Sequence, residues 1–215
     1  MKLGIFDSGI GGDAVATALS TSFPDAIIDT VNDHEHVPYG DKSPEEIIRL
    51  TDTAIQPFLD NSYDIVILAC NTATAIAIET LRSRYPTQKF IGIEPMIKSA
   101  AVQTESRIIA VLATPATLAS KRYNYLVQAY GSHLEILEPD CSDWAYLIEN
   151  NQINRSHVES TIDNVCKRGA DVIILGCTHY HWIKELITEI VAERASILEP
   201  SDAIGRRVRQ IMNLH

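Results

Sequence analysis

The chain of 215 residues contains no apolar run long enough to cross a membrane. A transmembrane helix needs about 18 or more consecutive apolar residues, and no stretch of this sequence approaches that length. We expect no signal peptide at the start of the chain, because a β-strand pattern already begins at Leu3. We therefore expect a protein that neither spans a membrane nor carries an export signal.

Cysteine is scarce, and its spacing is not that of a disulfide framework. The four cysteines, Cys70, Cys141, Cys166 and Cys177, form no CxxC motif. Two of them, Cys70 and Cys177, lie at the ends of apolar runs within motifs. Reduced thiols in a cytoplasmic protein fit this pattern better than disulfides do.

Positive charge is also in short supply. The 18 Lys and Arg residues face 28 Asp and Glu residues, which gives a formal net charge of −10. A field of this sign repels nucleic acid and anionic membrane surfaces, so we expect neither as a partner. An anionic small molecule would have to be held by local hydrogen-bond donors.

The most informative feature that is present is an internal repeat. The segment DIVILACNT, residues 64–72, returns as DVIILGCTH, residues 171–179, an offset of 107 residues (171 − 64) in a chain of 215. Each copy is an apolar, β-branched run that predicts a buried parallel strand. Each strand then ends in a cysteine, Cys70 or Cys177, followed by small polar residues.

The same offset relates other strand ends. It takes Asp7 to Thr114, and Asp33 to Asp140. Buried parallel strands resemble one another in general, but that resemblance does not explain a shared offset of the cysteines. Ligands of open α/β sheets bind at the carboxyl ends of the strands, so two thiols in two similar halves would face each other across one cleft. This arrangement suits chemistry that needs a base on each side of a substrate.

Strand and helix patterns alternate along both halves of the chain. The expected strands are 3–7, 26–31, 64–69, 89–93, 107–113, 134–138, 171–176 and 196–199, and the expected helices are 12–21, 44–60, 72–84, 95–103, 115–130, 143–150, 155–168, 180–193 and 201–213. Such alternation is typical of βαβ units and parallel sheets. We therefore predict an α/β protein, with two domains favoured by the repeat.

A glycine-rich loop follows the first expected strand. Its sequence, Asp7-Ser8-Gly9-Ile10-Gly11-Gly12, leads into a helix, and a helix N-terminus binds anions through its backbone N–H groups. Gly9-x-Gly11-x-x-Ala14 also matches a dinucleotide fingerprint loosely, with Asp29 or Asp33 about 20 residues further on. Nucleotide binding is therefore an alternative, although it leaves the paired thiols unexplained.

Two three-residue motifs place a thiol at the start of a helix: Cys70-Asn71-Thr72 and Cys177-Thr178-His179. A helix N-terminus stabilises a thiolate, which a proton-abstracting base requires. A single cysteine in an apolar run is usually a small core residue, but two at matching strand ends favour function. Val37-Pro38-Tyr39-Gly40 follows the second strand at the same end of the sheet, where it forms either a simple turn or a substrate-lining loop.

Metal and pyridoxal chemistry are weaker alternatives. His34-x-His36 and Cys177-x-His179-x-His181 contain zinc-ligand residue types. Residues two apart converge only in an extended segment, however, and 179–181 should already be entering a helix, so we expect no metal. No lysine lies in the strand-end motifs, as a pyridoxal Schiff base would require.

Six motifs in a fixed order carry a resemblance to a known family: FDSGIGG, VPYGDKS, ACNTAT, GIEP, ATPATLAS and GCTHY. From about residue 3 to 180 the chain resembles the cofactor-independent glutamate racemases of the aspartate/glutamate racemase superfamily. The resemblance implies two pseudo-symmetric three-layer α/β domains with mainly parallel sheets, and an active site in the cleft between them. The expected domains are 1–96 with 205–215, and 97–204.

The resemblance also implies a function and residue roles. It implies interconversion of L- and D-glutamate without a cofactor, which supplies D-glutamate for peptidoglycan, with a homodimer as the expected assembly. Cys70 and Cys177 would be the two acid/base residues, supported by Asp7 and His179 and assisted by Glu149. The groups that would hold the substrate are Ser8, Pro38, Tyr39, Gly40, Asn71, Thr72, Thr114, Thr117 and Thr178. An α-proton beside a carboxylate is weakly acidic, so this chemistry needs a desolvated thiolate and many hydrogen-bond donors.

The sequence departs from the family pattern in places. The family usually has arginine where this chain has His36, leucine at Asp13, valine at Ala145 and proline at His181, and its late Ile-Asp-Ser is replaced by Glu199-Pro200-Ser201. The chain length is closer to that of aspartate racemases, so aspartate, alone or with glutamate, is the alternative substrate. Outside enzymes, the alternative is a domain that only binds an acidic amino acid or a nucleotide, which has no need of two opposed thiols.

Overall fold

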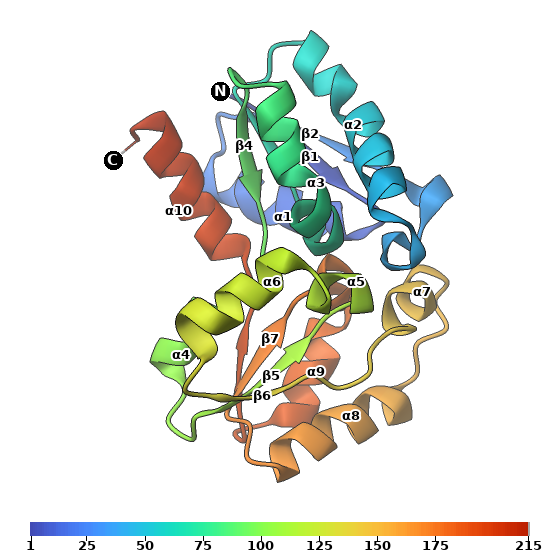
Figure 1. The fold of residues 1–215 in the computed structure, drawn as a ribbon, viewed down its shortest axis with the longest axis vertical. Coiled ribbons are helices and arrows are strands. Elements are labelled where there is room, and N and C mark those ends of the chain that lie inside the picture. Colours follow the sequence, from blue (N-terminus) through green and yellow to red (C-terminus); the bar gives the residue numbers. More distant parts are fainter. Residues whose placement is uncertain (215) are drawn as a thin grey trace. The chain divides into compact units, whose positions relative to one another are not determined.

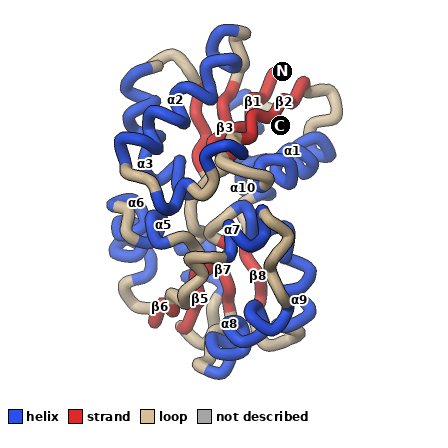
Figure 2. Tube along the Cα trace, turned by 90° about the vertical axis from the view of Figure 1, so that its right-hand side faces the viewer, coloured by secondary structure: helices blue, strands red, loops and turns tan. Residues whose placement is uncertain are grey.

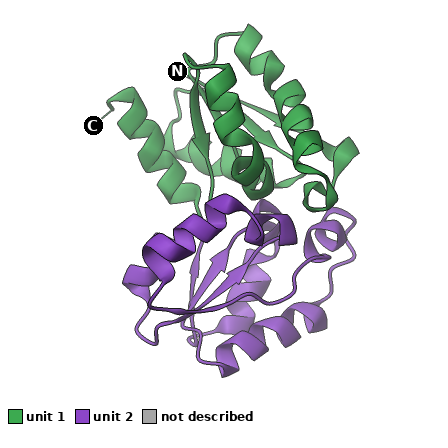
Figure 3. Ribbon diagram, in the orientation of Figure 1, with its two compact units in different colours: residues 1–94, 200–215 green, residues 95–199 purple. Residues whose placement is uncertain are grey.

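The computed structural model describes residues 1–214 (Figure 1). The chain divides into two compact units, residues 1–94 with the segment from Pro200 onward, and Pro95–Glu199 (Figure 3). Each unit carries a parallel sheet with helices on both faces, so the predicted α/β class is confirmed. The domain limits 1–96 with 205–215 and 97–204 stay a prediction. No helix among the described residues is both long and apolar enough to cross a bilayer.

The sheet of the first unit is built from the strands β1 (Lys2–Asp7), β2 (Ile27–Asn32), β3 (Ile65–Leu68) and β4 (Lys89–Gly92). They are parallel and lie in the order β2-β1-β3-β4. Asp7 pairs with Asn32, and Phe6 pairs with Leu68. This register brings the carboxyl ends of β1, β2 and β3 to one edge of the sheet.

The helices of the first unit are α1 (Gly11–Ser22), η1 (His34–His36), η2 (Tyr39–Asp41), α2 (Pro44–Asp60), α3 (Asn71–Arg84) and α10 (Ser201–Met212), with η1 and η2 of the 3₁₀ type. Because successive side chains of a strand point to opposite faces of the sheet, the helices pack against it on both faces. Phe6 and Leu68 pack against residues of α2 and α3. Ile5 and Ile67 pack against residues of α1 and α10 on the opposite face (Figure 2). The result is three layers around one buried sheet.

The second unit repeats this topology. Its strands are β5 (Ile108–Leu112), β6 (Glu135–Leu137), β7 (Val172–Leu175) and β8 (Ser196–Leu198). They are again parallel, in the order β6-β5-β7-β8. Each strand therefore takes the place of the strand four earlier in the chain, and the repeat seen in the sequence is a repeat of structure.

The helices of the second unit are α4 (Ile97–Gln103), α5 (Pro115–Leu118), α6 (Lys121–Leu126), the π-helical turn η3 (Val127–Gly131), α7 (Trp144–Glu149), α8 (Arg155–Lys167), the 3₁₀ helix η4 (Thr178–Ile183) and α9 (Lys184–Val191). Residues of α4 and α6 pack on Ile109 and Val111 of β5. The other face of the sheet is covered by α8 and α9, which pack against each other (Figure 1).

Local signals in the sequence explain several boundaries. Ser43 caps α2 by accepting a hydrogen bond from the Glu46 N–H at 3.2 Å, as its capping-box pattern predicts. Gly169 ends the turn after α8 with φ of +95°. The single helix expected at 115–130 is wrong, because the Ser120 hydroxyl accepts the Tyr123 N–H at 3.1 Å and starts a new helix. The helix expected from residue 180 begins instead as η4 at Thr178.

Candidate active site

Cys70 lies two residues beyond the end of β3 and caps the N-terminus of α3. Its sulfur accepts a hydrogen bond from the Ser8 hydroxyl at 3.1 Å and another from the Ala73 N–H at 3.4 Å. The residue is 5% exposed. Two donors and the positive end of a helix dipole all favour negative charge on this sulfur.

Asp7 and Ser8 reach the same edge from β1. Asp7 is fully buried, and its Oδ1 accepts the Gly9 N–H at 2.8 Å. At Gly12 a Cβ would lie 2.6 Å from Asn32 Oδ1 and 2.9 Å from Asp7 Cβ, so only glycine lets α1 start this close to the sheet edge. A buried carboxylate beside the glycine loop repels an anion, which disfavours a pyrophosphate at this place.

Asn71 follows Cys70 and begins α3. It is 3% exposed, and neither its side-chain nitrogen nor its side-chain oxygen has a hydrogen-bond partner among the described residues. Buried amides are normally paired, and an unpaired one costs about 1–3 kcal/mol. The arrangement is that of a group kept ready for a ligand. Thr72, the next residue, is buried as well.

Tyr39 lies in η2, flanked by Pro38 and Gly40, which are half-buried. Its ring packs against Phe6 with 6.1 Å between centroids, and its hydroxyl donates a hydrogen bond to Asp33 at 2.8 Å. Burial raises the pKa of Tyr39, and the bond to Asp33 raises it further, as do the nearby charges of Asp33, Cys70 and Asp7. The phenol therefore stays protonated.

Cys177 has the same position in the second unit, two residues beyond the end of β7, and is 7% exposed. Its sulfur lies 3.8 Å from Nδ1 of His179, and Nε2 of His179 lies 2.6 Å from Oε2 of Glu149. A carboxylate can only accept, so Nε2 carries a proton and Nδ1 faces the thiol. Thiol, imidazole and carboxylate thus form a series suited to proton transfer, with Thr178 buried beside them.

Thr114 and Thr117 occupy the neighbouring strand end. Their hydroxyl oxygens lie 3.0 Å apart, and the Thr114 hydroxyl also accepts the Thr117 N–H at 3.3 Å, which caps α5. Leu112 of β5 pairs with Leu175 of β7. Thr114 and Cys177 each lie two residues beyond these paired positions, at the same edge of the sheet.

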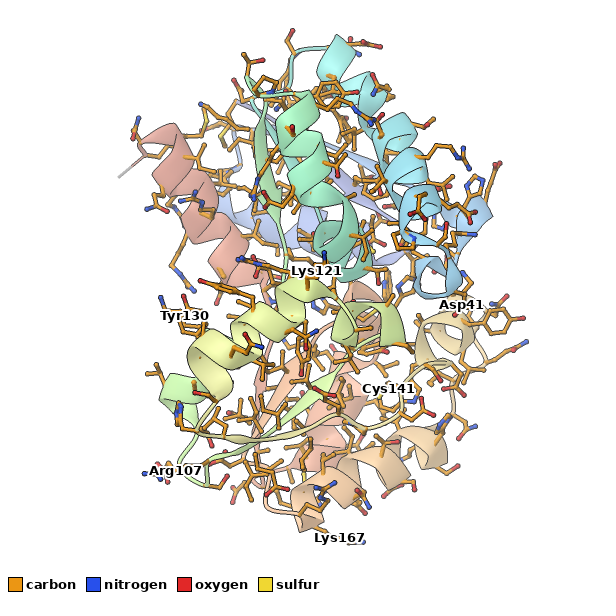
Figure 4. The ribbon with its side chains drawn as sticks, in the orientation of Figure 1. Asp41, Arg107, Lys121, Tyr130, Cys141 and Lys167 are labelled. Carbon is orange, nitrogen blue, oxygen red and sulfur yellow. The ribbon has the colours of Figure 1, made fainter. Side chains whose placement is uncertain are left out.

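Some residues that support the site were not predicted from the sequence. The Tyr180 hydroxyl donates to the carbonyl of Cys141 at 2.9 Å, and the Tyr180 ring packs against Trp144 with 5.4 Å between centroids. Cys141 lies in the loop between β6 and α7 (Figure 4), and burial raises the pKa of its thiol. These contacts fix η4, which begins directly after Cys177. Aromatic residues in a helical pattern give no sign of such a role.

Three of the histidines singled out in the sequence, His36, His179 and His181, lie near a carboxylate. His36 Nδ1 lies 2.7 Å from Asp33 Oδ1, and His181 Nε2 lies 3.8 Å from Glu199 Oε2. Within residues 1–214 no group of three or more His, Cys, Asp or Glu side chains is arranged to hold a metal ion. In the same part of the chain no cysteine takes part in a disulfide.

Each unit is an α/β unit with a parallel sheet, and each has a buried cysteine just after its third strand. The protein is therefore of the class of duplicated α/β folds with one strand-end cysteine in each half. Residues 13–204 match the model of the Asp/Glu/Hydantoin racemase family, and the chain belongs to that family. The resemblance carried by the six sequence motifs is thereby confirmed.

Similar proteins include both curated relatives and solved structures. The glutamate racemase of Sulfurovum sp. (strain NBC37-1) is 40% identical over 215 residues, which cover 97% of this chain and 81% of that protein. The structure of glutamate racemase from Francisella tularensis subsp. tularensis SCHU S4 in complex with D-glutamate is 26% identical, with a TM-score of 0.82 over 99% of this chain and 81% of that chain. Escherichia coli glutamate racemase, solved with L-glutamate and the activator UDP-MurNAc-ala, is 23% identical and shares the fold, with a TM-score of 0.84 over 99% of this chain and 82% of that chain.

Proposed function

We propose that this protein is a glutamate racemase that interconverts L- and D-glutamate with two cysteines and no cofactor. The observation that carries the proposal is the matched position of Cys70 and Cys177, each two residues past the third strand of its unit and each buried among polar groups. Membership of the racemase family and 40% identity to a protein named glutamate racemase support it.

In the proposed reaction one cysteine, as a thiolate, takes the α-proton of glutamate. The C–H electron pair stays on the substrate as a carbanion conjugated with the α-carboxylate. The other cysteine, as a thiol, then gives its proton to the opposite face, so that protons and charge balance and the two sulfurs exchange protonation states. The proposal requires the two thiols to lie on opposite faces of the substrate. The family resemblance assigns Cys177 to the L-isomer and Cys70 to the D-isomer.

The two thiols have different means of support. Ser8 and the Ala73 N–H donate to the Cys70 sulfur, and Asp7 lies at the adjacent strand end. Cys177 instead has His179, oriented by Glu149. We propose that Ser8 and the Ala73 N–H stabilise the Cys70 thiolate while Asp7 takes part in moving its proton, and that the His179–Glu149 pair serves both purposes at Cys177.

Substrate binding falls to the donors around the two strand ends. Asn71 has an unpaired buried amide, and the helix start that follows Cys70 offers a positive dipole end to a carboxylate. The proposed set is Ser8, Pro38, Tyr39, Gly40, Asn71, Thr72, Thr114, Thr117 and Thr178. Local donors of this kind are needed because the chain as a whole carries a net charge of −10.

We further propose the setting that the family resemblance implies. The enzyme would act in the cytoplasm, where its thiols stay reduced, and supply D-glutamate for peptidoglycan. Its partner is the small-molecule substrate, and a homodimer stays a prediction about its assembly.

Circular dichroism of the free amino acid tests the function directly. L-glutamate and L-aspartate are offered separately in buffer without cofactor, using protein dialysed exhaustively against a chelator and protein not so treated. The expected result is loss of the L-glutamate signal to zero at equal rates in both preparations, with L-aspartate slower. Faster turnover of aspartate would reassign the substrate, a rate restored only by zinc would favour a metal site, and no racemisation of either acid would favour a binding domain.

A further inference from the structure

Asp33 makes two hydrogen bonds that the proposed reaction does not yet explain. Its Oδ2 accepts from the Tyr39 hydroxyl at 2.8 Å, and its Oδ1 lies 2.7 Å from His36 Nδ1, which must carry the proton because a carboxylate only accepts. The Asp33 side chain is 14% exposed and that of His36 is 40% exposed. Since each carboxylate oxygen has its own donor, the carboxylate is held in one orientation.

The backbone of Asp33 is fixed to the site. Its N–H donates to the carbonyl of Asp7 at 3.0 Å, which continues the pairing of β1 with β2 one residue past the end of β2. The His36 N–H in turn donates to the Asp33 carbonyl at 3.3 Å. Asp33 thus connects the edge of the sheet, at Asp7, with the loop that carries Tyr39.

Tyr39, which is hydrogen-bonded to Asp33, packs in the same part of the core as the Cys70 thiol. Tyr39 is 2% exposed and belongs to the same core cluster as Phe6 and Cys70. The helix η2, which holds Tyr39, contacts α3, the helix that Cys70 caps, and the charges of Cys70 and Asp7 both add to the raised pKa of Tyr39. The single hydroxyl proton is directed to Asp33 and is not available to the Cys70 sulfur.

We propose that Asp33 is a positioning residue for the Cys70 half of the reaction, and that His36, its second donor, helps it to hold Tyr39 in one orientation beside Cys70. The proposal rests on the racemase function proposed above. Without the carboxylate the phenol hydroxyl is released. It can then turn towards the nearby sulfur, where a donated hydrogen bond weakens the thiolate as a base.

The second unit contains the same kind of bond away from its thiol. The Tyr123 hydroxyl donates to Glu138 at 2.6 Å, and Glu138 is the first residue after β6, as Asp33 is the first after β2. Burial raises the pKa of Tyr123, and Glu138 raises it further. Tyr123 belongs to the core cluster of Ile109 and Val111, which does not include Cys177. Removal of Glu138 is therefore a matched control, since it frees a buried tyrosine of the same kind without reaching a thiol.

The experiment measures kcat/KM and the primary isotope effect with α-deuterated D-glutamate and α-deuterated L-glutamate. Wild type is compared with Asp33→Ala, Tyr39→Phe, the double variant and the control Glu138→Ala. We expect Asp33→Ala to lower kcat/KM about tenfold or more, because small misplacements at a reacting centre are costly. Its isotope effect should rise for the enantiomer whose α-proton Cys70 removes and fall towards one for the other, because proton transfer at Cys70 becomes rate-limiting.

The Tyr39→Phe background separates positioning from a general structural effect. There Asp33 has no hydroxyl to hold, so adding Asp33→Ala should change kcat/KM by less than about twofold. Glu138→Ala should leave both isotope effects as in wild type. If Asp33→Ala does not fold, His36→Ala, at a half-exposed position, should give the same asymmetry at smaller size.

Three outcomes would overturn the proposal. The first is a pair of isotope effects that change equally for both enantiomers of Asp33→Ala or do not change at all. The second is a loss of kcat/KM from Asp33→Ala that is just as large when Tyr39 is replaced by phenylalanine. The third is the same asymmetry of isotope effects in Glu138→Ala. A wild-type protein that racemises neither enantiomer is a different result, because it removes the proposed function itself before any variant is compared.

Discussion

Glu149 and His179 share a hydrogen bond of 2.6 Å between Oε2 and Nε2. The other ring nitrogen of His179 lies 3.8 Å from the Cys177 sulfur. Glu149 belongs to α7 and His179 to η4, and these two elements pack against each other. The bond therefore fixes which way the imidazole faces and which nitrogen it presents to the thiol.

Glu149→Gln should lower kcat about tenfold or more without changing the thermal midpoint by more than a few degrees. A neutral amide still accepts a hydrogen bond from Nε2, but it no longer stabilises a charged imidazolium. An increase of about 1.4 kcal/mol in the activation free energy lowers the rate tenfold. Steady-state kinetics in both directions checks this. Glu79→Gln, which removes an exposed carboxylate paired with Arg82, is the control and should keep the wild-type kcat. An unchanged kcat in Glu149→Gln would remove Glu149 from the proton-transfer series.

Asn71→Ala should raise KM while leaving the free energy of unfolding unchanged or higher. The side-chain amide is buried without a partner, so its removal relieves a cost of about 1–3 kcal/mol instead of breaking a bond. Thr74→Val on the same helix is the contrast, because the Thr74 hydroxyl bonds both Leu68 and Ile93. Urea unfolding should show a loss for Thr74→Val only. A similar loss in Asn71→Ala, with KM unchanged, would make Asn71 a structural residue.

Ile204→Ala should lower the free energy of unfolding by about 2–5 kcal/mol, the usual range for a buried isoleucine. Ile204 is 3% exposed and packs from α10 into the core face that holds Ile5 and Leu19. The exposed Arg206 on the same helix offers a control, and Arg206→Ala should change stability by no more than about 0.5 kcal/mol. Equal values for the two variants in denaturant unfolding would show that α10 does not belong to this core.

Asp171→Asn should destabilise the protein at neutral pH but less so in acid. Partial burial pushes the pKa of Asp171 upward, yet hydrogen bonds from Thr104, Ser106 and Glu105 outweigh it and lower the pKa below its usual value. A carboxyl whose pKa is lower in the folded state stabilises it fully above the unfolded pKa, and this is lost as pH falls through the folded pKa.

The difference in free energy of unfolding between wild type and Asp171→Asn should therefore be constant from pH 7 to about 5 and shrink below about pH 4. Urea titrations across that range measure it. A difference that widens as the pH falls would mean that the three hydrogen bonds do not favour the ionised form.

The repeat in the sequence predicted the topology because buried strands and their carboxyl ends are local features. Cys70 and Cys177 follow from it directly, and so does the position of Thr114 after β5. The offset of 107 residues does not relate equivalent positions where corresponding strands of the two units differ in length. It matched Asp33 with Asp140, but β2 has six residues and β6 has three, so Glu138 takes the place after the edge strand.

Contacts within loops could not be predicted from the sequence for a different reason. The bonds of Asp33 with Tyr39 and His36 join residues of an irregular segment that no periodicity describes. The break at Ser120 was missed because a capping serine inside an apolar helical pattern competes with that pattern, and here the cap prevails. The roles of the site residues stay predictions, since they depend on a substrate.

The central claim is that one thiol serves each face of the substrate, and single Cys70→Ser and Cys177→Ser variants test it most directly. A serine hydroxyl is far too weak a base to take the α-proton, so each variant should lose racemisation while its remaining thiolate still works from one side. The measurement is α-deuterium incorporation in deuterated water, followed by NMR, with D- and L-glutamate offered separately. The account predicts exchange from one enantiomer in each variant and from opposite enantiomers in the two, with Cys177→Ser exchanging the D-isomer and Cys70→Ser the L-isomer. Exchange of the same enantiomer by both variants, or full racemisation by either, would contradict it.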